Sequence, residues 1–75
     1  FGSKGLFAHL REKGYEAVEL CGVVTNICVI SNAVIAKTAL PEADVAVHAA
    51  LCGSNDPALH HKALEVMASF QVDII

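Results

Sequence analysis

Cys28 is the residue of this chain most suited to chemistry, because it stands three residues after a good helix N-cap, Thr25. The apolar stretch before Thr25 is predicted to be a buried strand, so Cys28 falls in the first turn of the helix that follows. Backbone N–H groups there lack helical partners, and the positive end of the helix dipole favours a thiolate. This predicts a nucleophile. An isolated cysteine is as often a small buried hydrophobe, and position alone does not separate the two.

The segment around this cysteine, Gly22-Val23-Val24-Thr25-Asn26-Ile27-Cys28-Val29, resembles the nucleophile motif of the isochorismatase-like cysteine hydrolases. That superfamily includes the nicotinamidases. The resemblance extends over further segments: Phe1-Gly2-Ser3, Ser31-Asn32-Ala33, Asp44–Ala49 and the helix expected near Pro57. It therefore spans nearly the whole chain, and the motif around Cys28 is its specific part.

The resemblance implies a three-layer, doubly wound parallel sheet with helices on both faces, and a catalytic set of Asp, Lys and Cys. Cys28 matches the cysteine. The Asp and Lys of family members lie upstream of the position of Phe1, as do the Asp and His ligands that hold zinc or a similar metal in the nicotinamidase branch. Residues 1–75 are therefore expected to be the C-terminal part of a single isochorismatase-like domain, truncated at the N-terminus. We expect no metal or cofactor in this chain, and no activity of the chain alone.

The resemblance also implies an oxyanion hole. In the family, the peptide bond between the residues matching Val23 and Val24 is cis, which turns the Val24 N–H towards the nucleophile; the sequence alone would favour an ordinary trans strand end. With the N–H of Cys28, it would stabilise the tetrahedral intermediate of acyl transfer. The implied activity of the complete enzyme is nicotinamidase-like hydrolysis of small amides or related C–N bonds through a Cys28 thioacyl intermediate. The alternative is a non-catalytic α/β module that associates with another chain through its apolar faces.

The pattern along the chain predicts alternating helices and strands. These are a helix over 3–13 that Ser3 caps and Gly14 ends, a strand within 15–24, a helix over 26–39, a strand over 44–50, a helix from Pro57 capped by Asp56, and a short strand over 72–75. This order predicts an α/β fold with parallel strands and right-handed crossovers. The helix over 26–39 is apolar almost all round, which predicts burial on every side.

Two further helices are predicted to bury an apolar stripe. In the first helix the stripe is Leu6, Phe7 and Leu10; in the third it is Leu59, Ala63, Leu64, Met67 and Phe70.

The other residues able to do chemistry are assigned no site. Cys21 in the strand and Cys52 in a loop are predicted to be packing residues, and His48 is predicted to be a core histidine. Adjacent residues on a helix point in different directions, so at least one of His60 and His61 is expected on the surface, with no metal role. Three charged residues are also set aside: Asp44 and Asp73 at the strand starts opposite the chemistry, and Lys37 about 13 Å along the helix from Cys28.

Composition excludes several classes of function. The formal charge of the 75 residues is −3, with five scattered basic residues, which argues against nucleic-acid binding. No apolar run reaches the ~18 residues of a membrane helix. No GxGxxG follows a strand, which argues against a nucleotide-binding unit.

Two features of composition predict the setting and the partners. Three cysteines without a CxxC pair fit a reducing, cytoplasmic setting. A 55% apolar content is more than so small a chain needs, so we expect a homo-oligomer or association with a missing N-terminal part, around a small-molecule amide substrate.

Overall fold

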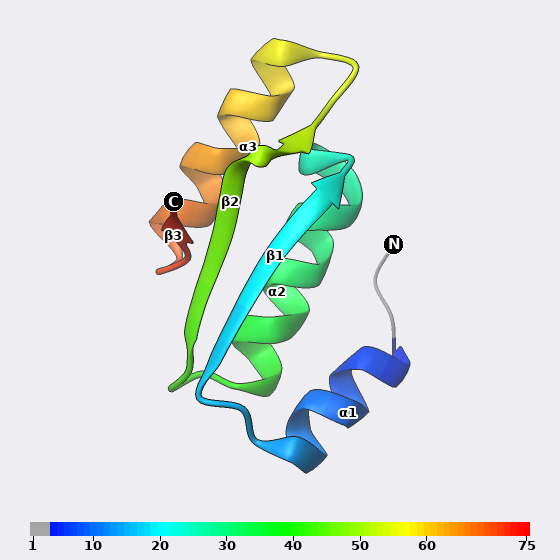
Figure 1. Cartoon of the computed structure of the whole chain (residues 1–75), viewed down its shortest axis with the longest axis vertical. Coiled ribbons are helices and arrows are strands. Elements are labelled where there is room, and N and C mark those ends of the chain that lie inside the picture. Colours follow the sequence, from blue (N-terminus) through cyan, green and yellow to red (C-terminus); the bar gives the residue numbers. More distant parts are fainter. Residues whose placement is uncertain (1–3) are drawn as a thin grey trace.

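A computed structural model describes residues 4–75, and its order of elements confirms the predicted alternation of helices and strands. The elements are α1 (Lys4–Lys13), β1 (Ala17–Val23), the π-helical turn η1 (Thr25–Val29), α2 (Ile30–Ala39), β2 (Asp44–Gly53), α3 (Pro57–Ser69) and β3 (Asp73–Ile74). The sheet has the order β1-β2-β3 with both pairings parallel, which confirms the α/β class. Helices α2 and α3 cover one face of it, and α1 packs alongside α2 (Figure 1).

Gly14 ends α1 as predicted. Its backbone has a φ of 63°, in the left-handed region that suits glycine, and its N–H donates to the Leu10 carbonyl at 2.9 Å. Leu10 is buried and Leu6 packs against the core, but Phe7 is 38% exposed, so its predicted place in the apolar stripe is wrong. The stripe is narrower than expected because the extensive contact of α1 is with one neighbouring helix, α2. The predicted cap, Ser3, lies outside the described residues.

The pairing of β1 with β2 contains an irregularity that shapes the end of the sheet. The register runs from Ala17↔Asp44 to Leu20↔Val47 and resumes at Gly22↔Cys52, so β2 carries extra residues in between. Gly22 lies at this irregularity with a φ of 118°, a backbone conformation that residues with a Cβ rarely adopt. Cys52 is thus part of β2, and its predicted place in a loop is wrong because pairing restarts beyond the bulge.

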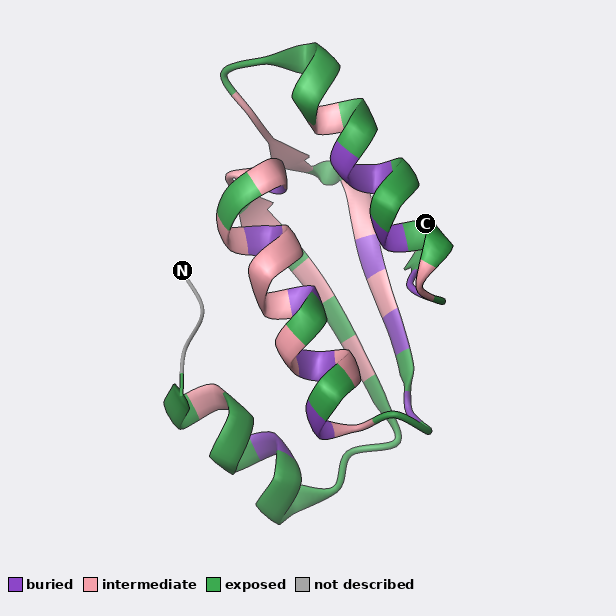
Figure 2. Cartoon of the chain, turned by 180° about the vertical axis from the view of Figure 1, so that it is seen from behind, coloured by how far each residue is buried: buried purple, intermediate pink, exposed green. Residues whose placement is uncertain are grey.

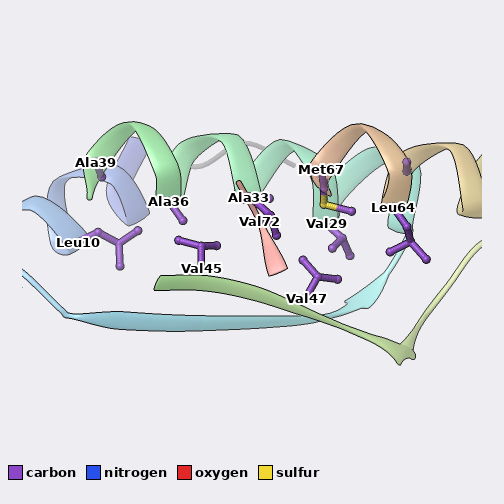
Figure 3. Packing of buried hydrophobic residues seen from close by; sticks show 11 residues of the cluster. Leu10, Val29, Ala33, Ala36, Ala39, Val45, Val47, Leu64, Met67 and Val72 are labelled. Atoms are coloured by element: carbon purple, nitrogen blue, oxygen red, sulfur yellow. The ribbon is translucent and has the colours of Figure 1, made fainter. Parts of the chain in front are cut away.

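Buried apolar side chains fill the space between the helices and the sheet. Figure 3 shows Val45 and Val47 pointing from β2 towards α2 and α3, with Met67 and Leu64 above them on α3. On α2 the buried residues are Ala33, Ala36 and Ala39, whose small side chains let the helix lie close to the strands. The opposite side of α2 is open, and Val34 is 49% exposed, so the prediction of burial on every side is wrong for the described residues.

Helix α3 begins as predicted, with an Asp56 side chain that accepts hydrogen bonds from the N–H groups of Ala58 at 3.0 Å and Leu59 at 3.2 Å. Pro57 occupies the start of the helix. Ala63, Leu64 and Met67 are buried and Phe70 packs against the core, whereas Leu59 is 42% exposed, contrary to expectation. The first turn of α3, which contains Leu59, extends beyond the ends of the strands (Figure 1).

The other face of the sheet is not covered by the helices of residues 4–75. Seen from the helix side in Figure 2, β1 alternates between half-buried and exposed residues, as expected for a strand with one packed face. His48 lies on the uncovered face, where its Nε2 contacts the Glu19 carboxylate. Its predicted place in the core is therefore wrong, because the pleat of β2 directs Val45 and Val47 to the core and His48 away from it.

Candidate active site

The segment that joins β1 to α2 carries the predicted nucleophile. The peptide bond between Val23 and Val24 is cis, and Val24 has an extended backbone and is the N-cap of η1. The Val24 carbonyl accepts hydrogen bonds from Ile27 N–H at 3.0 Å and Val29 N–H at 3.1 Å. The second of these spans five residues and makes the turn wider than an α-helical one. Cys28 therefore lies within the first turn of a helix, as expected, though one position further in.

Thr25 is not the N-cap, and that prediction is wrong. It is completely buried, with 0% of its surface exposed, and its hydroxyl lies 3.1 Å from the Gly53 carbonyl and 2.7 Å from Nδ1 of His60. The side chain thus turns away from the N–H groups of its own helix and binds the end of β2 and the start of α3. A buried hydroxyl needs hydrogen-bond partners, and it forms these bonds with the groups that surround it in the interior. For Thr25 these groups belong to other elements, so its hydroxyl does not cap its own helix.

A second side-chain link joins the same two regions. The Ser54 hydroxyl donates to Asn26 Oδ1 at 2.6 Å and accepts from the N–H of Asp56 at 3.2 Å. On the other side of η1, Asn32 Nδ2 donates to the Cys28 carbonyl at 2.8 Å. The turn that carries the cysteine is therefore held from β2, from α3 and from α2.

Cys28 is half-buried and lines a hollow of about 400 Å³. This volume lies within the range of small-molecule sites, which are mostly apolar with a few polar groups. The walls come from α1, the carboxyl end of β1 and the start of α2: Leu6, Leu20, Cys21, Gly22, Val23, Cys28, Val29 and Asn32. Open α/β sheets bind ligands at this end of their strands. The cysteines are the only ionisable side chains among these lining residues.

The other two cysteines differ from Cys28 in place and surroundings. Cys21 is exposed, so its predicted packing role is wrong for the described residues. Cys52 packs against the core, as expected. Burial raises the pKa of the Cys52 thiol above its ordinary value, a hydrogen bond with the backbone of Gly22 opposes this, and the nearby Cys21 adds to it.

The adjacent histidines on α3 have different surroundings, and His60 is the residue that sequence reasoning missed. His61 is exposed and only touches the His60 ring edge-on, whereas His60 is half-buried with its Nδ1 on Thr25. The sequence carries one signal for this, namely that residues i and i+1 of a helix cannot share a face. It does not say which of the two points inward.

A larger hollow, of about 510 Å³, opens at the amino ends of the strands. It is lined by the α1–β1 turn and the α2–β2 turn: Gly14, Tyr15, Glu16, Ala39, Leu40, Pro41, Glu42, Ala43 and Asp44. Neither a cysteine nor a histidine borders it. Asp44 and Asp73 both begin strands and so lie towards this end, as predicted.

Between residues 4 and 75, no three His, Cys, Asp or Glu side chains come together in a group that could hold a metal ion. In the same range, no helix has the length and apolar character needed to cross a membrane.

The whole chain, residues 1–75, matches the sequence profile of the isochorismatase domain. No protein of curated function is similar enough in sequence to count as a match.

Two solved structures resemble the chain in fold. A pyrazinamidase of Pyrococcus horikoshii, solved in complex with zinc, superimposes with a TM-score of 0.81 and 30% identity over 93% of the chain. An isochorismatase-like hydrolase from Alkaliphilus metalliredigens superimposes with a TM-score of 0.74 and 29% identity over 92% of the chain. The chain spans only 38% and 37% of these two structures, respectively.

Proposed function

The chain belongs to the isochorismatase family, and from that premise we propose that it is the nucleophile-bearing part of a cysteine hydrolase for small amides or related C–N bonds. The observation that carries the proposal is the place of Cys28. It lies in the first turn of a helix, half-buried, in a hollow at the carboxyl end of a parallel strand. A thiol so placed is exposed to the field of unpaired N–H groups and close to where ligands bind in such sheets.

The proposed reaction proceeds in two stages. A base takes the proton of the Cys28 thiol, and the thiolate adds to the carbonyl carbon of the amide. The N–H groups of Val24 and Cys28 donate to the oxyanion that forms. The C–N bond then breaks, the amine leaves with a proton, and water hydrolyses the thioester to release the acid and restore the thiol.

The groups that move protons in this scheme are proposed to lie outside residues 4–75. No carboxylate or lysine borders the hollow among the described residues, and the family resemblance implies an Asp and a Lys upstream. General acid–base help contributes roughly 10²–10⁴-fold, so we propose that the 75-residue chain alone has background activity only.

Zinc, or a similar metal, is a further proposal for the complete enzyme. Its support is that the similar pyrazinamidase of Pyrococcus horikoshii was solved with zinc. The side chains of residues 4–75 do not by themselves form a group that fits the ion. No step of the proposed reaction is routed through it.

The test is hydrolysis by the full gene product that contains this chain. Nicotinamide, pyrazinamide and other small amides are screened by ammonia release, with the Cys28→Ala variant and the isolated 75-residue chain measured in parallel. We expect turnover of at least one amide, which Cys28→Ala abolishes. An unchanged rate in Cys28→Ala, or sustained turnover by the isolated chain, would contradict the assignment.

Exposed apolar side chains support a second proposal, association with another chain, which does not depend on catalysis. Val23 is 71% exposed and Leu51 is 61% exposed, both near the carboxyl end of the sheet. Exposed apolar surface of this kind favours association. Light scattering on the folded 75-residue chain tests it, and a sharp monomer peak would argue against it.

A further inference from the structure

The hydrogen bonds around Thr25 determine which nitrogen of His60 carries a proton. The Thr25 hydroxyl has one hydrogen and lies within hydrogen-bond distance of both the Gly53 carbonyl, at 3.1 Å, and Nδ1 of His60, at 2.7 Å. A carbonyl only accepts, so the hydroxyl hydrogen goes to Gly53. Both bonds can exist together only if His60 carries its hydrogen on Nδ1 and donates it to Thr25 Oγ1.

The result is a directed series of hydrogen bonds, from His60 Nδ1–H to Thr25 Oγ1–H to the Gly53 carbonyl. It joins the first turns of α3, the first residue of η1 and the last residue of β2, three segments that come together at the carboxyl end of the sheet (Figure 1). Thr25 is completely buried, so water cannot readily replace either partner. Cys28 lies three residues further along the same turn.

We propose that His60 is a positioning residue for the nucleophile. Through Thr25 it fixes the turn that carries Cys28 and the N–H groups proposed to bind the oxyanion. The catalytic effect of His60 rests on the proposed function, whereas the hydrogen-bond series does not depend on it.

His60 acts through Thr25 and does not reach into the Cys28 hollow. It borders a separate hollow of about 230 Å³ with Cys52, Gly53, Ser54 and Pro57. The Asn26–Ser54 link also braces the turn, and both links are partly buried. The bond to His60 differs in that its Thr25 partner is completely buried and Asn26 is not, so its loss leaves a hydroxyl that water cannot readily reach. We therefore expect this loss to displace the turn, and displacements of about 1 Å can cost about 100-fold in rate.

The first test needs no substitution. Nitrogen-15 NMR of the histidine rings in the full gene product identifies the protonated nitrogen of His60. We expect Nδ1 to be protonated at a pH where the ring is neutral, while the exposed His61 serves as the internal reference. An unprotonated Nδ1 with a protonated Nε2 would overturn the inference, whatever the enzyme does.

The second test compares variants of His60 in the same protein. His60→Ala removes the donor, whereas His60→Asn keeps an N–H group near the position of Nδ1, and His61→Ala is the matched control. We expect His60→Ala to lower kcat by about 10- to 100-fold with little change in KM, since substrate does not touch His60. His60→Asn should recover most of the loss, and His61→Ala should resemble the unmodified protein.

Alkylation of Cys28 by iodoacetamide gives a readout that does not need a substrate. We expect His60→Ala to slow it and His60→Asn to restore it. Equal effects of His60→Ala and His61→Ala, or no rescue by His60→Asn, would overturn the positioning role while leaving the Cys28 assignment intact. Conversely, an unchanged rate of amide hydrolysis in Cys28→Ala would contradict the proposed function. The NMR measurement would still show whether the hydrogen-bond series exists.

Discussion

The two ends of the parallel sheet differ in how their turns are held. At the amino end, backbone groups close the turns: Gly14 N–H donates to Leu10 at 2.9 Å, and Asp44 N–H donates to Glu16 at 2.9 Å. At the carboxyl end, backbone N–H groups also close η1 on the Val24 carbonyl, and the side chains of Thr25, His60 and Ser54 add further links between the segments.

The hollows at the two ends of the sheet also differ, in volume and in the side chains that line them. The amino-end hollow is larger, about 510 Å³ against about 400 Å³, yet only the smaller one contains the proposed nucleophile. Backbone closure holds a turn with almost any side chains, whereas side-chain links hold particular atoms in place. Bracing of the turn by side chains, more than the size of the hollow, therefore marks the end of the sheet where chemistry is proposed.

The largest effect is expected from altering the sulfur itself. Cys28→Ser in the full gene product should lower amide hydrolysis by about 10³-fold or more, because a serine hydroxyl is barely ionised near neutral pH. Glu42→Gln, in the larger hollow, is the control and should leave the rate within about twofold, since it lies at the opposite end of the sheet. Steady-state ammonia release measures both. A comparable loss of activity in Glu42→Gln would contradict the placement of the chemistry at the carboxyl end of the sheet.

The same substitution at two threonines contrasts a buried hydroxyl with an exposed one. Thr25→Val should lower the free energy of unfolding by about 1–3 kcal/mol, because Gly53 and His60 lose a buried partner. Thr38→Val should change it by less than about 0.5 kcal/mol, since Thr38 is exposed and bonds only the carbonyl of Val34 in its own helix. Urea denaturation gives both values. Equal losses would show that burial of the Thr25 bonds is not what stabilises the carboxyl end.

Gly14 tests whether the amino end depends on backbone conformation alone. Gly14→Ala should cost about 1–2 kcal/mol of unfolding free energy, because a φ of 63° is unfavourable for a residue with a Cβ. No heavy atom lies within 4 Å of the added Cβ, so no clash contributes. Gly14→Asn should cost less, since asparagine tolerates this conformation better. Thermal unfolding measures both variants, and equal destabilisation would contradict the role given to the positive φ of Gly14.

The smallest effect concerns the ionisation of Cys52. Burial, the largest cause, raises its pKa above the ordinary value of 9.0, so the folded chain keeps this proton to a higher pH than the unfolded chain. The unfolded state then binds fewer protons than the folded state, and stability falls as pH rises above that value. Denaturant midpoints should decline from about pH 8 to about pH 10, and less so in Cys52→Ala. An equal decline in the variant would assign the effect to another group.

Local features of the fold were predictable because short-range interactions decide them. Asp56 followed by Pro57 starts α3, and Gly14 ends α1, as expected from capping and from glycine's access to positive φ. The alternating helices and strands were enough to predict parallel pairing. Cys28 was placed correctly in a first helical turn for the same reason, since strand end and helix start are both local signals.

Features that depend on packing were predicted poorly. Phe7 and Leu59 belong to apolar stripes by spacing, but each is exposed because no neighbour covers it. His48 was assigned to the core although the pleat of β2 directs it to the uncovered face. Periodicity gives the faces of an element, but not which parts of a face meet another element.

The amino-acid sequence by itself determined the alternation of helices and strands, the start of α3 at Pro57, and the place of Cys28 at a strand-to-helix junction, because each depends on residues close together in the chain. The same alternation was enough to predict parallel pairing. Only the tertiary structure decided what Thr25 does. Its hydroxyl can cap its own helix or bind His60 and Gly53, and local sequence favours the cap. Folding buries Thr25 beside residues 28 and 35 positions away, and a buried hydroxyl takes the partners that surround it.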